Sequence, residues 1–255
     1  MTDGAVVAVA SAKGGVGKTT TSINLGAAIV ANTPKSALLV EGDLGMANVL
    51  DFLDLPHDPR VDPSLHEVLA GAAPVEAAIV EAANGLAALP SGDDVEGFRR
   101  ADPRNLEQVV ETVRKEYDVV VIDTPAGVSL QTLFPLSIAD GVVLVSNPRV
   151  SAIRDTKKTK TLTERVGGTT VGLILTMTGT GTAPSSERLA DFLEVPLVAG
   201  VPDDPAVASA QDAGRAVVDY KPNAPASQAY YDAAKELGFL ASEPEESRAD
   251  AGYST

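Results

Sequence analysis

The sequence predicts an α/β fold: a single domain in which a mostly parallel sheet carries helices on both faces. Apolar runs of strand length alternate along the chain with segments of helical periodicity, and this alternation is typical of parallel strands joined by helical crossovers. Several of the runs are continuous Val/Ile/Leu stretches, as in strands buried on both faces. With 255 residues, 44% of them hydrophobic, the chain is long enough for one such domain with a large core.

The expected elements can be placed along the chain from these patterns. Strands are expected at 5–10, 37–40, 118–122, 141–146, 171–175 and 195–201, with a shorter one at 86–89. Helices are expected at 18–31, 103–115, 129–138, 150–165, 203–213 and 225–238. The proline-containing segment 54–64 is expected to be a surface loop. The domain is expected to cover 1–241, and the acidic, polar stretch 242–255 to be a disordered tail.

The most informative motif is SAKGGVGKTT at residues 11–20, directly after the first expected strand. A strand, a glycine-rich turn and a helix opened by Lys-Thr-Thr form the layout of a phosphate-binding loop (P-loop), in which backbone N–H groups and a helix N-terminus surround an anion. Lys18 is expected to reach the β- and γ-phosphates, and the Thr19 hydroxyl to ligate Mg²⁺. The other expected nucleotide-binding residues of the loop are Gly14, Gly15, Val16, Gly17 and Thr20. The motif therefore predicts binding of a nucleoside triphosphate.

A second motif, DVVVIDTPAG at 118–127, ends a buried strand with Asp123. Ligands of open parallel sheets bind beyond the carboxyl ends of the strands, so Asp123 is expected to hold Mg²⁺ through a water, as a Walker B aspartate does. The Gly127 backbone N–H is expected to approach the γ-phosphate. The alternative for Asp123 is an N-cap at the end of the strand, and the upstream P-loop favours the metal role.

A third motif, ALLVEGDLGMAN at 37–48, also ends a strand in acidic residues, Glu41 and Asp43. Asp43 is expected to orient the water that attacks the γ-phosphate and to contribute to the metal site, because phosphoryl transfer needs positioning more than covalent chemistry. The alternatives are an outer Mg²⁺ ligand alone or a simple turn residue.

Lys13 is a second lysine, at the entrance of the P-loop. From there it cannot easily fold back onto its own γ-phosphate, but it can neutralise a phosphate that faces it across an interface. We therefore expect hydrolysis to require both ATP and a homodimer, which would make the protein a nucleotide-timed switch. The alternative is a solvated lysine without a role.

These motifs together resemble the MinD/ParA family of deviant Walker A ATPases, a SIMIBI-class group of P-loop proteins. The similarity includes KGGVGKTT at 13–20, DLGMAN at 43–48, VSNPRVSAIRD at 145–155 and VPDDPAV at 201–207. The resemblance implies ATP/ADP and Mg²⁺ as cofactors, slow ATP hydrolysis stimulated by a partner, and two subunits that sandwich two ATP molecules, with Lys13 reaching the partner's phosphates. It also implies adenine contacts near Asn147, Pro202 and Asp203.

Two departures from the family pattern limit these implications. MinD proteins usually end in a basic amphipathic helix, whereas 242–255 is acidic, so membrane association is left open. The apolar stripe of the segment 225–240 is expected to face the core. After the strand 171–175 the family often has Asn or Arg for the base, where this chain has Thr176 and Met177, so strict selection of adenine is also left open.

Composition restricts the function further. The absence of cysteine excludes disulfides and iron–sulfur clusters. No apolar run approaches the ~20 residues that span a membrane, and no signal peptide is visible. The expected location is the cytoplasm, or the periphery of a membrane or polar assembly reached through a partner. His57 and His66 lack metal-ligand spacing and are assigned to surface and helix-start positions.

The net charge of −15 makes DNA an unfavourable partner. A few basic residues gather on the segment 149–160, where a solvated helix face is favoured over a partner surface. Three functions remain: a MinD-like ATPase that positions the division site or another cellular assembly, a ParA-like DNA partition ATPase, and a weakly hydrolysing nucleotide-gated scaffold or regulator. Each would act with an unidentified protein activator or cargo.

Lysine is scarce while Ala, Thr, Gly and Asp are plentiful, which we interpret as adaptation to a salt-rich cytoplasm of the kind found in salt-adapted archaea. The alternative is an ordinary acidic protein. Because salt screens repulsion between exposed carboxylates, we expect the free energy of unfolding to fall as KCl is diluted from molar to millimolar concentration. Urea unfolding followed by circular dichroism measures this, and an unchanged midpoint would contradict the salt interpretation.

Overall fold

The computed structural model describes residues 3–46, 48–127, 129–179 and 183–240. Within these ranges one eight-stranded sheet runs in the order β3-β4-β2-β5-β1-β6-β7-β8. Every neighbouring pair is parallel except β3 and β4, so the expected mostly parallel sheet is confirmed. The strands are β1 (Ala5–Ala10), β2 (Ala37–Glu41), β3 (Val80–Glu81), β4 (Ala87–Leu89), β5 (Val119–Asp123), β6 (Gly141–Ser146), β7 (Thr170–Thr178) and β8 (Leu197–Pro202).

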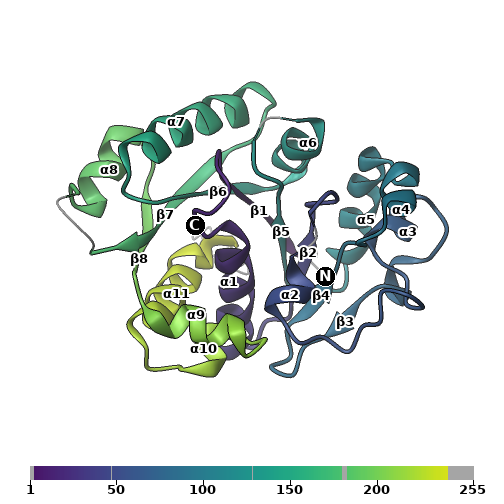
Figure 1. The fold of residues 1–255 in the computed structure, drawn as a ribbon. Helices are drawn as coiled ribbons and strands as arrows, with labels where there is room; N and C mark the ends of the chain where they lie inside the picture. Colours follow the sequence, from purple (N-terminus) through teal and green to yellow (C-terminus); the bar gives the residue numbers. More distant parts are fainter. Residues whose placement is uncertain (1–2, 47, 128, 180–182, 241–255) are drawn as a thin grey trace, which may run out of the picture.

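Helices cover both faces of the sheet (Figure 1). On one face lie α1 (Lys18–Asn32), α9 (Pro205–Asp212), α10 (Val217–Tyr220) and α11 (Pro225–Glu236), with α2 (Val49–Phe52) beside them. On the other lie α3 (Leu65–Leu69), α4 (Val95–Arg100), α5 (Leu106–Val113), α6 (Leu130–Ile138), α7 (Val150–Arg165) and α8 (Ser186–Leu193). Three 3₁₀ turns, η1 (Val75–Ala77), η2 (Pro103–Asn105) and η3 (Leu237–Leu240), complete the described elements.

The core is built almost entirely from aliphatic side chains. β1, β2, β5 and β6 contribute continuous buried runs, as the unbroken apolar stretches predict. The largest fully buried side chain is Tyr230 on α11, and it packs in one cluster with Ala233, Ala234 and Leu237. The expected core-facing stripe of this helix is thus confirmed for these four residues.

Several short elements had not been predicted. Helices α2, α3, α4 and α10 span four to six residues, too few for an apolar period to repeat. Helix α8 was also not among the expected helices. Its sequence does carry helix signals, since Ser185 caps it and Leu189, Ala190 and Leu193 form a buried face. The expected helix 103–115 is divided into the 3₁₀ turn η2 and α5, because Pro103 opens it behind the Asp102 cap.

The expected loop at 54–64 contains no helix or strand. The expected tail at 242–255 lies outside the described residues, so the boundary at 241 stays a prediction. In the ranges that the structure does describe, none of the helices has the length and apolar character needed to traverse a bilayer.

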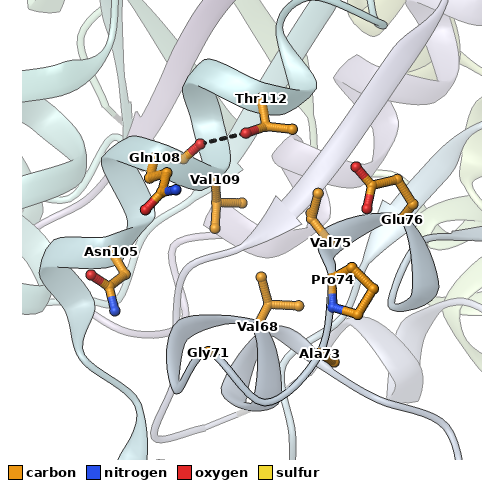
Figure 2. Close-up of a pocket in the computed structure, with 10 residues that line it drawn as sticks. All are labelled: Val68, Gly71, Ala73, Pro74, Val75, Glu76, Asn105, Gln108, Val109 and Thr112. Carbon is orange, nitrogen blue, oxygen red and sulfur yellow. Dashed lines mark hydrogen bonds between the residues drawn. The ribbon is translucent and has the colours of Figure 1, made fainter.

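A cavity of about 320 Å³ lies on the helical face between α3, η1 and α5. Val68, Val75 and Val109 form its apolar wall, and Asn105 and Gln108 stand at one side (Figure 2). None of its lining residues belongs to the P-loop or to the acidic strand ends, so this cavity is separate from the site described next.

Candidate nucleotide site

The segment after β1 has the conformation that a phosphate-binding loop requires. Gly15 and Gly17 have φ angles of 76° and 86°, which side chains with a Cβ rarely adopt. Gly17 is the N-cap of α1, and Lys18 is the first helical residue. A Cβ on Gly14 or Gly15 would meet no atom within 4 Å, so open space adjoins the loop where backbone amides can surround an anion.

The carboxylate of Asp123 is the centre of the polar interactions behind this loop. Lys18 Nζ lies 2.9 Å from Asp123 Oδ1, and the Thr19 hydroxyl donates to Oδ2 at 2.7 Å. Ser22, which had not been predicted, donates to Oδ1 at 2.8 Å. Both charged side chains are buried, so each charge is compensated by the other away from water. Ser22 could have been found from its spacing, because it stands four residues after Lys18 on one helix face.

The end of β2 lies beside Asp123. Glu41 and Asp123 are partners in the register of β2 and β5, and the Gly42 N–H donates to the Asp123 carbonyl at 2.8 Å. Gly42 is required here, because a Cβ would lie 2.9 Å from that oxygen. The next residue, Asp43, therefore begins its loop close to the P-loop lysine.

Burial raises the pKa of both carboxyl groups at this strand end. For Glu41, desolvation raises the pKa to about 7 although the Ser91, Asn48 and Val49 amides donate to its oxygens. For Asp43, desolvation raises the pKa while the Lys18 charge acts in the opposite direction. Glu41 is thus a structural acceptor for backbone amides, whereas Asp43 lines a cavity together with Lys13, Lys18 and Thr19.

Two neighbouring cavities meet at the P-loop. The phosphate-side cavity has a volume of about 310 Å³, and the base-side cavity about 220 Å³. Both are lined by Gly17 and Thr20. The phosphate side contains Lys13, Gly14, Gly15, Lys18, Thr19 and Asp43, together with Ala126.

The base-side cavity contains Pro202 and Asp203, two of the three residues expected near adenine. Asn147 is not among its lining residues; it is buried, and its side-chain oxygen accepts from the Arg149 N–H. Gln211, Val207 and Tyr230 line this cavity without having been predicted. Gln211 donates to the Thr20 hydroxyl at 2.7 Å, a contact across 191 residues that no local pattern reveals.

The remaining predicted residues take supporting positions. Val16 is buried, and its carbonyl accepts from the Thr176 hydroxyl at 2.6 Å. Gly127 has a φ of 95° in the turn after β5. Lys13 forms an ion pair with Asp155 of α7 at 3.0 Å, with 45% of its side chain exposed.

The donor set fits Mg²⁺ bound together with phosphate. Thr19, Asp43 and Asp123 offer hard oxygen ligands, which Mg²⁺ prefers. Among the described residues no group of three or more His, Cys, Asp or Glu side chains gathers to hold an ion.

A buried parallel strand, a glycine loop that caps a helix, and a lysine and threonine on one carboxylate define a P-loop nucleoside triphosphatase. The profile of the ParA family, described as NUBPL iron-transfer P-loop NTPase, matches residues 4–238. The chain belongs to the ParA family of P-loop NTPases. The septum site-determining protein MinD of Synechocystis is 32% identical over 223 residues, covering 84% of this chain and 81% of the relative, so within the family the chain is a MinD-like ATPase. Because it contains no cysteine, it has no thiolates for an iron–sulfur cluster.

Known relatives extend over nearly the whole chain. An uncharacterized ATP-binding protein of Methanocaldococcus jannaschii is 37% identical over 232 residues, covering 91% of this chain and 86% of the relative. The crystal structure of the Pyrococcus furiosus cell division ATPase MinD has a TM-score of 0.87 and 35% identity, covering 93% and 99% of the two chains. The septum site-determining protein MinD of Pyrococcus horikoshii, complexed with Mg-ADP, has a TM-score of 0.86 and 35% identity, covering 93% and 97%.

Replacement of Lys18 by alanine tests the phosphate site. The variant loses a buried cation that would contact phosphate, so we expect ATP affinity to fall by about a hundredfold or more. Fluorescence titration with a labelled ATP analogue measures this. Lys115→Ala, at an exposed position outside the site, is the control and should bind as the natural protein does. If the natural protein, Lys18→Ala and Lys115→Ala bound ATP with equal affinity, the phosphates would not bind at Lys18.

Proposed function

We propose that this protein is a Mg²⁺-dependent ATPase whose ATP-bound homodimer acts as a spatial-positioning switch for the division site or another cellular assembly. The observation that carries the proposal is the convergence of Lys18 and Thr19 on Asp123 beside a cavity shaped by the P-loop. The names of the two Pyrococcus MinD proteins support the assignment to cell division and to Mg-nucleotide binding.

The proposed mechanism assigns one task to each side chain. Lys18 contacts the β- and γ-phosphates, and the P-loop amides hold the remaining oxygens. Thr19, Asp43 and Asp123 would hold Mg²⁺ directly or through water, and the ion would supply positive charge that neutralises the phosphates. Asp43 orients the attacking water. Two observations support this role: Asp43 lines the phosphate-side cavity, and the charge of Lys18 acts to lower the pKa of its carboxyl group.

Lys13 supports the proposed homodimer. Its ion pair with Asp155 is partly exposed, with 45% of the Lys13 side chain and 23% of the Asp155 side chain accessible, and solvent screening weakens such a pair. Lys13 can therefore leave Asp155 at little cost and reach the phosphate of a second subunit. Its place among the lining residues of the phosphate-side cavity and the 45% exposure of its side chain support a role toward a second subunit.

The DNA partition function is less favoured by the charges on α7. Lys157 stacks on the ring of Phe192, and Lys158 pairs with Asp155. Lys160 lies within 4 Å of two acids, Glu164 and Glu194. These contacts engage the three lysines of α7, while Arg149 and Arg154 stay exposed, so the net charge of −15 is the stronger argument against a phosphate backbone as the partner. We propose a protein activator or cargo as the partner, a cytoplasmic location, and peripheral association with membranes or polar assemblies through that partner.

Replacement of Asp43 by alanine tests the catalytic assignment. We expect ATP binding to remain and the hydrolysis rate to fall about a hundredfold, because water is no longer positioned. The dimer should then persist with ATP, as light scattering after size exclusion would show. Hydrolysis by Asp43→Ala at the rate of the natural protein would refute this mechanism.

Replacement of Lys13 by alanine tests the shared site. The variant should bind ATP but stay monomeric and lose measurable turnover, since the charge offered across the interface is gone. Light scattering with ATP or ADP, phosphate release and nucleotide titration are measured in parallel, with Lys115→Ala as the control. An ATP-dependent dimer with full activity in Lys13→Ala would contradict the role in trans.

A further inference from the structure

His66 is a buried histidine that the nucleotide chemistry does not use. It is the second residue of α3, and 1% of its surface is exposed. A capping box fixes the start of this helix, since the Ser64 hydroxyl accepts from the His66 N–H and Glu67 bonds back to Ser64. The backbone from which the imidazole projects is therefore fixed.

The ring of His66 contacts the loop that carries Asp43. His66 Nε2 lies 2.9 Å from the carbonyl oxygen of Leu44, the residue directly after Asp43. With a proton on Nε2 the imidazole donates to this carbonyl. The Ser91 hydroxyl lies 3.3 Å from the same nitrogen. The contact joins α3 to the middle of the loop across 22 residues of sequence.

The surrounding residues leave space that the imidazole fills. A Cβ on Gly92 would lie 2.5 Å from His66 Nδ1, and one on Gly97 would lie 3.0 Å from it. The ring of Phe98 packs against the imidazole at 6.2 Å in an edge-to-face arrangement. Gly92 and Gly97 thus leave room for the imidazole because neither has a side chain.

Other contacts hold the two ends of the same loop. At its start the Gly42 N–H donates to the Asp123 carbonyl, and at its end the Val49 N–H donates to Glu41 at 2.8 Å. The Asp43 side chain itself accepts the Met46 N–H at 3.2 Å within the loop. The ends are therefore tied to the sheet, and His66 ties the middle, next to the acid, to α3.

We propose that His66 is a positioning residue for ATP hydrolysis: its bond to the Leu44 carbonyl fixes the loop so that Asp43 is held at the γ-phosphate side. The inference rests on the proposed function, since it assigns a purpose to the placement of Asp43. A misplacement of a reacting group by about 1 Å can cost about a hundredfold in rate. Loss of the bond should therefore lower kcat while leaving nucleotide binding, which uses the P-loop, nearly unchanged.

The test compares His66→Phe, which keeps a ring but removes the donor, with His66→Gln, whose amide nitrogen can restore it. We expect kcat for ATP to fall about tenfold in His66→Phe with KM within about twofold, and most of the loss to be recovered in His66→Gln. His57→Ala, the other histidine of the chain, is the matched control and should keep full activity. Hydrogen exchange of residues 43–46 should become faster in His66→Phe and stay unchanged in His66→Gln and His57→Ala.

Gly92→Ala provides an independent route to the same effect. Its Cβ would displace the imidazole, so kcat should fall although His66 is present, and the double variant with His66→Phe should lose no more than His66→Phe alone. This variant carries the test if His66→Phe does not fold, as judged by its thermal transition. Full activity in both variants, or a loss that appears in KM, would overturn the positioning role.

Asp43→Ala measured beside these variants separates the two levels of inference. If it is as active as the natural protein, the proposed hydrolytic mechanism fails whatever the histidine does. If it is inactive while His66→Phe and Gly92→Ala turn over normally, only the role of His66 fails. In the Asp43→Ala background, His66→Phe should cause no further loss of residual turnover, because there is no carboxylate left to position.

Discussion

The organisation of this site depends on the buried carboxylate of Asp123. A lysine charge at the start of a helix and away from water needs a compensating anion, and the tip of β5 supplies one at 2.9 Å. The same carboxylate accepts from Thr19 and Ser22, so it aligns the first turn of α1 with the sheet. One carboxylate therefore anchors the P-loop to the sheet, and the opposite side of the loop borders the cavity in which a ligand can bind.

A second level of organisation joins the loops around this anchor. The last residue of β2, Glu41, pairs with Asp123 in the sheet register. The N–H of the next residue, Gly42, donates to the Asp123 carbonyl oxygen. Glu41 then gathers backbone amides from the loop after β4 and from the start of α2. The acid that faces the phosphate side is consequently carried by a short loop with fixed ends. The fixed ends limit how far Asp43 can move. Because the rate of phosphoryl transfer depends on the positions of the reacting groups, even a small displacement of this loop would change the rate.

The sequence was sufficient for the fold class and for locating the side chains that gather at the P-loop; their roles toward phosphate stay predictions. Continuous apolar runs identified six strands within a few residues, and the glycine and lysine pattern located Lys18 and Thr19 because a local motif determines both. It was insufficient where geometry depends on distant segments. Gln211 reaches Thr20 from α9, and Lys13 meets Asp155 of α7, and neither pairing leaves a local signal. Asn147 follows β6 as expected, yet its side chain turns to its own backbone neighbourhood rather than to the base-side cavity.

The two-residue strand β3 at the margin of the sheet has a consequence for how copies of this protein can meet. It runs antiparallel to β4 and occupies the outer side of that strand. So brief an outermost strand presents few unpaired amides and carbonyls to a neighbouring chain. Growth of the sheet into a continuous intermolecular ribbon is disfavoured along this border. The homodimer proposed above would instead meet through the loops at the carboxyl ends of the strands, where bound nucleotide can control association.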